Sequence, residues 1–160
     1  MGMLDNKVGI VTGASQGIGR AIALSYAREG ARVVVADFNE EMGRETVSLI
    51  EESGGSAAFS FGDVSKEESV KAMVEHAVQS YGRLDIACNS AALSRGAGPI
   101  HEYDRSVFEQ TIEMCLTNTW LCMKYEIAAM LENEGGAIVN ISSNSSLRGQ
   151  PYNTAYAAAK

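Results

Sequence analysis

The sequence predicts an α/β fold, a doubly wound parallel sheet with helices on both faces and therefore three αβα layers. Short apolar runs alternate with amphipathic segments along the chain, which favours parallel strands joined by crossover helices. Glycines close most of the amphipathic segments, as they commonly close helices. No repeat or linker interrupts this alternation, and 46% of the residues are hydrophobic. Residues 1–160 are therefore expected to form one domain with one core.

Strands are expected where short apolar runs end at glycine or small polar residues. The first is Val8–Thr12, a β-branched run that leads into glycines. Arg32–Asp37 contains three valines in succession, which predicts a strand covered on both faces. The remaining strands are expected at residues 57–61, 84–89 and 137–141.

The first two helices are expected between these early strands. Residues 17–29 carry apolar side chains near helical spacing, and Gly30 follows as a stop. Asn39 can cap the second helix, which is expected to continue to about Ser53.

The later helices have signals of the same kind. Ser65 and Glu68 have the spacing of a capping box that would open the third helix, and Gly82 would close it. One long helical pattern begins at Asp104 or Ser106 and continues to about residue 132.

The charge and hydropathy of the chain exclude two classes of partner. Acidic residues outnumber basic ones 20 to 13, the net charge is −7, and no basic run is present. Nucleic-acid binding rests largely on clustered Lys and Arg, so no nucleic-acid partner is expected. The chain also lacks an apolar run of the roughly 18 residues that a membrane span needs, and it begins without an apolar signal segment. We expect a cytoplasmic protein with no membrane partner.

The cysteines and histidines show no metal-binding pattern. Cys88, Cys115 and Cys122 are odd in number and lack C-x-x-C spacing, which favours reduced thiols. His76 and His101 have no companion at a ligand spacing. No metal site is therefore expected.

A glycine-rich loop, Thr-Gly-Ala-Ser-Gln-Gly-Ile-Gly at residues 12–19, follows the first strand. Glycine permits a sharp turn and close approach of a pyrophosphate to backbone N–H groups. The next helix would direct its unpaired N–H groups at that anion. An ordinary strand–helix turn is the alternative, but the position inside a strand–helix–strand unit favours dinucleotide binding. The expected binding residues are Gly13, Ser15, Gln16, Gly17, Ile18 and Gly19.

Asp37 closes the second strand, roughly twenty residues after the loop. A carboxylate at this place accepts hydrogen bonds from the adenosine ribose and repels a 2′-phosphate. An acid favoured by a helix dipole is the alternative. Because Gln16 rather than a basic residue stands where a phosphate could be held, the sequence favours NAD over NADP.

Further motifs follow in the rest of the chain, namely Asp63-Val64, Asn89-Ser90-Ala91-Ala92, Ser143 and Tyr156-Ala157-Ala158-Ala159-Lys160. Together with the glycine loop, they resemble the short-chain dehydrogenase/reductase family of the single-domain type, from Thr12 to Lys160. The resemblance rests on their joint occurrence in family order. It implies a Rossmann-like fold and an NAD-dependent oxidoreductase that acts on an alcohol or ketone.

The resemblance also implies contacts to adenosine. Asp63 would accept from the adenine amino group while the Val64 amide contacts the ring; a turn residue is the alternative for Asp63. Asn89 begins the counterpart of the family's Asn-Asn-Ala-Gly, in which Ser90 and Ala92 replace the second Asn and the Gly. The expected cofactor contacts beyond the loop are Asp37, Phe38, Asp63, Val64, Asn89, Ser90, Ala91, Ile141, Tyr156 and Lys160.

The expected catalytic residues are Ser143, Tyr156 and Lys160. Oxidation of an alcohol needs a base, and a phenol, with a pKa of about 10, becomes one when a nearby cation stabilises the phenolate. Lys160 lies four residues after Tyr156, on the same face of a helix, and by the resemblance also holds the nicotinamide ribose. Ser143 would bond the substrate oxygen. A surface i,i+4 pair and a loop serine are the alternatives.

Two departures from the family stand out. The family's Asn that supports a water relay to the lysine falls on Cys115 in this chain, with Asn118 three residues later. A thiol is a poor relay partner, and either residue could take the role. Family members also continue past the counterpart of Lys160, so the intact enzyme is expected to be longer.

The leading interpretation is an oxidoreductase for a small secondary alcohol or ketone. An NAD-binding homologue without turnover is one alternative, and a nucleotide-sugar epimerase or dehydratase, which shares Tyr-x-x-x-Lys, is another. Substrate specificity is expected from loops 93–103 and 144–154. The apolar surplus of the long helix, which includes Trp120 and Leu131, favours a homo-oligomer, a dimer or tetramer, with core burial as the alternative.

Overall fold

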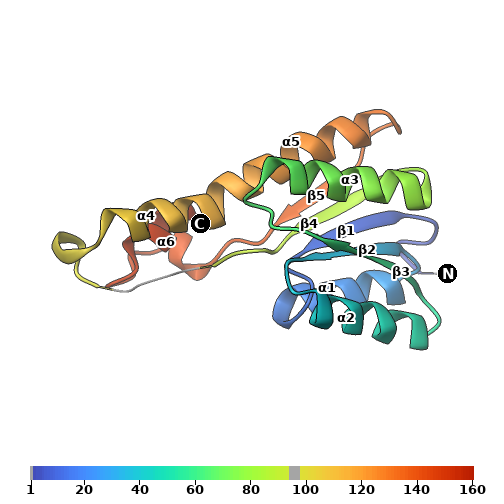
Figure 1. The fold of residues 1–160 in the computed structure, drawn as a ribbon, viewed down its shortest axis with the longest axis horizontal. Coiled ribbons are helices and arrows are strands. Elements are labelled where there is room, and N and C mark those ends of the chain that lie inside the picture. Colours follow the sequence, from blue (N-terminus) through green and yellow to red (C-terminus); the bar gives the residue numbers. More distant parts are fainter. Residues whose placement is uncertain (1, 94–97) are drawn as a thin grey trace.

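The computed structural model describes residues 2–93 and 98–160. Its centre is a five-stranded parallel sheet in the order β3-β2-β1-β4-β5 (Figure 1). The chain winds outward from β1 to β3, then returns to β4 on the other side of β1, so the winding reverses between β1 and β4. The strands are β1 (Val8–Thr12), β2 (Arg32–Asp37), β3 (Ser56–Phe61), β4 (Ile86–Asn89) and β5 (Ala137–Asn140).

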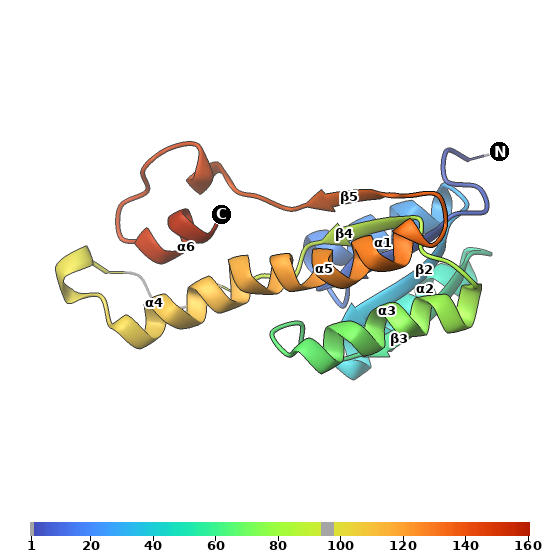
Figure 2. The ribbon, with the colours of Figure 1, turned by 90° about the horizontal axis from the view of Figure 1, so that it is seen from above.

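Helices cover both faces of the sheet, which confirms the expected three layers (Figures 1 and 2). The helices α1 (Gly17–Arg28) and α2 (Glu40–Glu52) lie on one face, and α3 (Glu67–Tyr81) and α5 (Asn118–Leu131) lie on the other. Beyond the carboxyl ends of the strands, α4 (Arg105–Ile112) packs against α6 (Thr154–Ala159).

The sheet separates two hydrophobic clusters. The side chains of each strand alternate between the faces, so β1 contributes Val8 and Ile10 to one cluster and Val11 to the other. Val33, Val34 and Val35 are fully buried, as the run of three valines predicts. The paired clusters therefore hold β1, β2 and β4 rigidly in place, and these strands carry the site.

The helix caps confirm two expectations and correct one. Asn39 caps α2 by accepting from the Met42 N–H at 3.1 Å, and Gly82 ends α3 in the left-handed region at φ 83°. The expected capping box at Ser65 and Glu68 is wrong, because α3 begins at Glu67. The backbone N–H of Ser65 instead donates to the Asp63 carboxylate.

The long helical pattern is one continuous run with a change of pitch (Figure 2). Asp104 caps its start by accepting from the Ser106 N–H at 2.7 Å. Between α4 and α5 the segment Glu113–Thr117 is π-helical, so the run contains an extra residue at this point. Cys115 lies in the middle of this segment. A local π turn of this kind commonly marks a functional site.

Within the part of the chain that the structure describes, no helix is long and apolar enough to cross a membrane. In the same ranges, no group of three or more His, Cys, Asp or Glu residues could hold a metal ion.

Candidate active site

The glycine loop forms a tight turn between β1 and α1. Gly13 has φ +65°, a conformation that side chains disfavour, and a Cβ there would lie 2.9 Å from the Ala91 Cα. A Cβ on Gly19 would lie only 2.1 Å from the Gly13 carbonyl oxygen. The loop therefore packs on itself and on the turn after β4 more closely than any side chain allows.

Side chains of α1 and α2 hold this loop in place by hydrogen bonds to its carbonyl groups. The Thr46 hydroxyl of α2 donates to the Ala14 carbonyl at 3.0 Å, and the Arg20 Nε donates to the Ser15 carbonyl at 2.8 Å. The helix α1 begins at Gly17, and the first N–H groups of a helix have no partner within it. The carbonyls of Ala14 and Ser15, by contrast, are already occupied. The loop is thereby arranged to offer N–H donors to an anion.

The turn after β4 is tied to the end of β1. The Thr12 hydroxyl oxygen accepts from the backbone N–H groups of both Ser90 and Ala91 at 3.1 Å. Thr12 and Asn89 are also paired in the parallel register of β1 and β4. The two turns that flank the winding reversal are therefore held as one unit. In doubly wound sheets this is where ligands bind.

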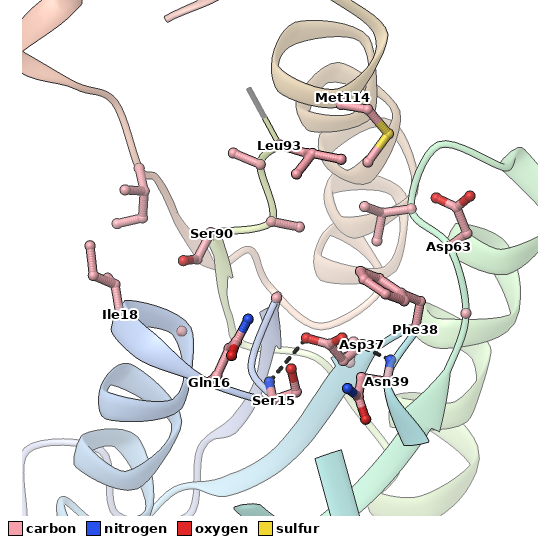
Figure 3. A pocket seen from close by; sticks show the side chains of 18 of the residues that line it. Ser15, Gln16, Ile18, Asp37, Phe38, Asn39, Asp63, Ser90, Leu93 and Met114 are labelled. Carbon is pink, nitrogen blue, oxygen red and sulfur yellow. Dashed lines mark hydrogen bonds between the residues drawn. The ribbon is translucent and has the colours of Figure 1, made fainter. Parts of the chain in front are cut away.

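A cavity of about 430 Å³ opens at this position (Figure 3). Its lining comes from the glycine loop, from the carboxyl ends of the strands and from α6. Of the expected residues, it includes Gly13, Ser15, Gln16, Ile18, Gly19, Asp37, Phe38, Asp63, Val64, Ser90, Ala91, Ile141, Tyr156 and Lys160. The structure thus brings together most of the expected site residues, which lie between Gly13 and Lys160 in the sequence.

Three expected residues lie outside the lining. Gly17 is the first residue of α1, and Asn89 is buried beneath the turn that it begins. Ser143 caps the short turn Asn144–Ser146, where its hydroxyl accepts from the Ser145 N–H at 3.1 Å. The preceding Ser142 lines the cavity instead, and its hydroxyl donates to the Lys160 carbonyl at 3.0 Å.

The cavity also contains Ala92 of the motif after the fourth strand and Leu93 of the expected substrate loop. Sequence reasoning missed part of the wall, namely Ala36, Asn39, Gly62 and Met114. Leu93 and Met114 form an apolar side opposite Phe38 (Figure 3). Met114 lies in the π turn of the long helix, and hydrophobic periodicity gives no signal for such a turn. Residues 94–97 of the expected substrate loop 93–103 lie outside the described residues.

Asp37 is held rigidly at one end of the cavity. Its carboxylate accepts from the Ser15 N–H at 3.0 Å and from the Asn39 N–H at 2.9 Å, and the side chain is only 7% exposed (Figure 3). Arg20, which donates to the Ser15 carbonyl of the loop, forms an ion pair with Glu45 at 2.6 Å. Among the described lining residues, Lys160 is the only basic one, so the negative charge of Asp37 has no cation beside it.

Asp63 lies at the same end as Phe38, on the turn after β3 (Figure 3). Its carboxylate accepts from the Ser65 N–H at 2.9 Å, as a turn residue would, yet it still lines the cavity. The two interpretations of Asp63 are therefore compatible. Phe38 is 71% exposed, and its ring presents a flat apolar surface at the cavity edge.

Tyr156 and Lys160 stand at the opposite end, both on or next to α6. The Lys160 ammonium donates to the Ile141 carbonyl at 2.7 Å and lies 5.9 Å from the centre of the Tyr156 ring. Burial lowers the pKa of Lys160, and the Cys115 thiol opposes that shift. The expected i,i+4 pair thus faces the cavity rather than bulk solvent.

Cys115 and Asn118 have different surroundings. Cys115 is buried, its thiol donates to the Leu93 carbonyl at 3.5 Å, and it lies close enough to Lys160 to influence its pKa. Asn118 donates to the Ala91 carbonyl at 3.2 Å and to the Met114 carbonyl at 2.8 Å. Asn118 therefore braces the cavity wall, while Cys115 interacts electrostatically with the Lys160 ammonium.

The comparison with protein families agrees with this geometry. Residues 7–160 match the family model described as short chain dehydrogenase. The chain belongs to the short-chain dehydrogenase family. A solved structure of a short-chain dehydrogenase/reductase from Burkholderia xenovorans superposes with a TM-score of 0.94 at 36% identity, and the match covers 99% of this chain and 65% of that one.

Curated relatives of this short-chain dehydrogenase include proteins with assigned reactions. The chain is 41% identical over its whole length to a 3beta-hydroxysteroid dehydrogenase from Mediterraneibacter gnavus, of which it covers 58%. It is also 41% identical to a 2,5-dichloro-2,5-cyclohexadiene-1,4-diol dehydrogenase from Sphingobium indicum, of which it covers 63%. An uncharacterized oxidoreductase from Bacillus subtilis is 43% identical and is covered to 58%. The chain therefore spans about three fifths of the length of these relatives.

Proposed function

We propose that this short-chain dehydrogenase transfers a hydride between NAD and a small secondary alcohol or ketone. The observation that carries the proposal is one cavity that joins the glycine loop and Asp37 at one end to Tyr156 and Lys160 at the other. Dinucleotides bind at this place in doubly wound sheets. The relatives that act on a hydroxysteroid and on a diol support an alcohol as substrate.

The residues present fit an NAD molecule. The close approach at Gly13 and Gly19 leaves room for a pyrophosphate against the loop backbone, and the start of α1 offers N–H donors. Asp37 is the acceptor for the adenosine ribose, and the Phe38 ring is the surface for adenine. When bound, the nicotinamide accepts or donates the hydride.

Tyr156 is the proposed acid/base. In alcohol oxidation its phenolate oxygen takes the hydroxyl proton from the substrate, and the Lys160 ammonium stabilises the phenolate by its charge. The bond from Lys160 to the Ile141 carbonyl holds the ammonium close to the Tyr156 ring. Ser143 and Ser142 are both candidates for the donor to the substrate oxygen, and Ser142 is the one that lines the cavity.

A second candidate function is NAD binding without turnover. Two observations favour it: the Ser143 hydroxyl is engaged with Ser145 outside the cavity, and a thiol at Cys115 stands near Lys160. An epimerase or dehydratase of nucleotide sugars has no comparable support here. Turnover separates the two remaining functions.

The test is Tyr156→Phe in the full chain, assayed with a panel of secondary alcohols and NAD by NADH absorbance. The variant keeps the ring and removes the hydroxyl, so we expect turnover to fall by about 100-fold or more while NADH affinity stays within about twofold. Tyr81→Phe is the control, because Tyr81 lies at the far end of α3 and stacks on Arg32. Activity retained by Tyr156→Phe would refute the assignment, and NAD binding without turnover in the unmodified chain would favour the second function.

We also propose that the protein is a homo-oligomer through the long helix. Between residues 116 and 131 of this helix four large apolar side chains are exposed, namely Leu116, Trp120, Ile127 and Leu131. Their spacing places them along one stretch of helix surface, and an exposed apolar surface of this kind marks an interface. A cytoplasmic location is in keeping with the three free thiols.

A further inference from the structure

A fully buried carboxyl group lies directly beneath the cavity. Glu126 is on α5, which packs over β4, and its side chain is 0% exposed. One oxygen, Oε2, accepts from the Asn89 Nδ2 at 3.0 Å. The same Nδ2 donates to the Asn140 Oδ1 of β5 at 3.0 Å, so both amide hydrogens of Asn89 are used.

Two buried oxygen atoms remain without a partner in this group. They are the Oε1 of Glu126 and the Oδ1 of Asn89, the two side-chain oxygens that the bond between Nδ2 and Oε2 does not use. An ionised carboxylate and an amide oxygen can both only accept hydrogen bonds. An ionised Glu126 therefore leaves both of these oxygens without a donor. A buried acceptor without a donor is strongly unfavourable.

The surroundings of Glu126 offer no compensating charge. No ion pair among the described residues includes it. The titratable groups that interact with it are two thiols, Cys88 of β4 and Cys122 one turn earlier on α5, while β5 presents the neutral Asn140. On the side of α3 the packing against α5 is apolar, and the Glu67–Lys124 pair between those helices is exposed.

We propose that Glu126 is held as a neutral carboxylic acid that forms a closed two-bond ring with the Asn89 amide. Oε1 carries the proton and donates to Oδ1, while Nδ2 donates to Oε2, so a single proton satisfies both orphaned atoms. Glu126 is then a positioning residue. It clamps Asn89, whose next two residues form the cavity wall that Thr12 holds.

The ring makes the fold sensitive to pH near neutrality. Burial raises the pKa of Glu126 from 4.5 to about 7, while the bond from Asn89 opposes this rise. Because the folded state holds the proton more tightly than the unfolded chain, the stabilisation is complete below about pH 4.5 and is lost as the pH rises through about 7. From these values the unfolding equilibrium constant should rise about 70-fold between pH 5 and pH 8 through this group alone.

The matched variant is Glu126→Gln, because glutamine has the shape of the protonated acid and the same donor and acceptor. Its amide N–H donates to the Asn89 Oδ1 and its oxygen accepts from Nδ2 at every pH. Urea unfolding of the full chain at pH 5 to 8 should show the rise in the wild type and lose about 70-fold of it in the variant. Glu132→Gln, exposed at the end of the same helix, is the control and should keep the wild-type dependence. An equal dependence in Glu126→Gln and wild type would overturn the proposal.

Infrared spectroscopy of the wild type keeps the test decisive if the variant does not fold. A carboxyl group with an ordinary pKa is ionised at pH 6, so a protonated-carboxyl C=O band there identifies a neutral buried acid. We expect the band at pH 6 and its disappearance by pH 8. Its absence at pH 6 would overturn the proposal.

A final readout concerns the cavity and rests on the proposed function. NADH should bind the wild type more weakly at pH 8 than at pH 6, and Glu126→Gln equally well at both. Equal wild-type affinity at the two pH values would remove the positioning role. Failure to bind NADH at either pH would instead refute the proposed cofactor, while the unfolding and infrared results would still decide the state of Glu126.

Discussion

The selection of NAD over NADP should depend on the Asp37 carboxylate. The change that tests it is Asp37→Asn, which removes the charge and keeps the size of the side chain. In the wild type both carboxylate oxygens accept from backbone N–H groups, from Ser15 at 3.0 Å and from Asn39 at 2.9 Å, so the charge cannot swing away from an incoming phosphate. Arg20 is paired to Glu45, so no other cation of the described lining residues offsets the charge at this end of the cavity.

The size of the effect follows from Coulomb's law. Two unit charges about 4 Å apart repel by about 1 kcal/mol in water and by about 4 kcal/mol at the effective dielectric of a protein surface. Asp37 is only 7% exposed, so the larger of the two values is the closer one. A 2′-phosphate carries more than one charge, so the wild type should bind NADH at least about tenfold more tightly than NADPH. Asp37→Asn should reduce that preference by about tenfold or more.

The assay is fluorescence titration of the full chain with NADH and NADPH at two salt concentrations. Because Asn can accept only one of the two backbone bonds, the variant should also lose about 1 to 3 kcal/mol of stability, which denaturant unfolding measures. Asp63→Asn is the control, since Asp63 is a carboxylate in the same cavity at the expected adenine position and should affect both cofactors alike. A wild type that binds NADPH as tightly as NADH, or a preference unchanged by Asp37→Asn, would refute the reasoning.

Two further predictions concern the loop and the long helix. Gly19→Ala places a Cβ 2.1 Å from the Gly13 carbonyl oxygen, so the loop must shift, and NADH affinity should fall by about tenfold or more in a fluorescence titration. In Gly17→Ala the Cβ meets open space and only the positive φ is strained, so the melting temperature should drop by a few degrees and NADH affinity should fall less than in Gly19→Ala; equal binding losses would contradict the clash. Trp120→Glu should convert an oligomer to smaller species in sedimentation, because it charges a side chain that is 57% exposed on the helix surface. Phe61→Glu, 66% exposed on β3, is its control, and a wild type that sediments as a monomer would exclude the interface.

Local signals in the sequence were sufficient for most of the fold. The Asn39 cap, the stop at Gly82 and the run of valines in β2 act through neighbouring residues, so their structures follow from short-range sterics and hydrogen bonding. The capping box at Ser65 failed for a reason that is also local. The Asp63 carboxylate accepts from the Ser65 N–H, which a capping box would have paired with Glu68. The turn at Asp63 and the capping box compete for the same donor.

The candidate site was predictable where its residues stand at the ends of strands. In a parallel sheet these ends meet at one edge, so the loop at Gly13, Asp37 and Ser90 had to converge once the alternation of strands and helices was recognised. Helical spacing predicted that Tyr156 and Lys160 share one face of a helix, and the family resemblance predicted their place at the site.

Tertiary packing alone decided the remainder. Which of Ser142 and Ser143 lines the cavity depends on the path of the chain after β5. Met114, which also lines the cavity, lies in a π turn. Glu126 has the sequence signature of an ordinary helix glutamate, and only the packing of α5 on β4 buries it against Asn89. Burial depends on contacts between residues 37 apart, for which the sequence carries no local signal. For the same reason the protonation of Glu126, which burial sets, is a property of the folded molecule.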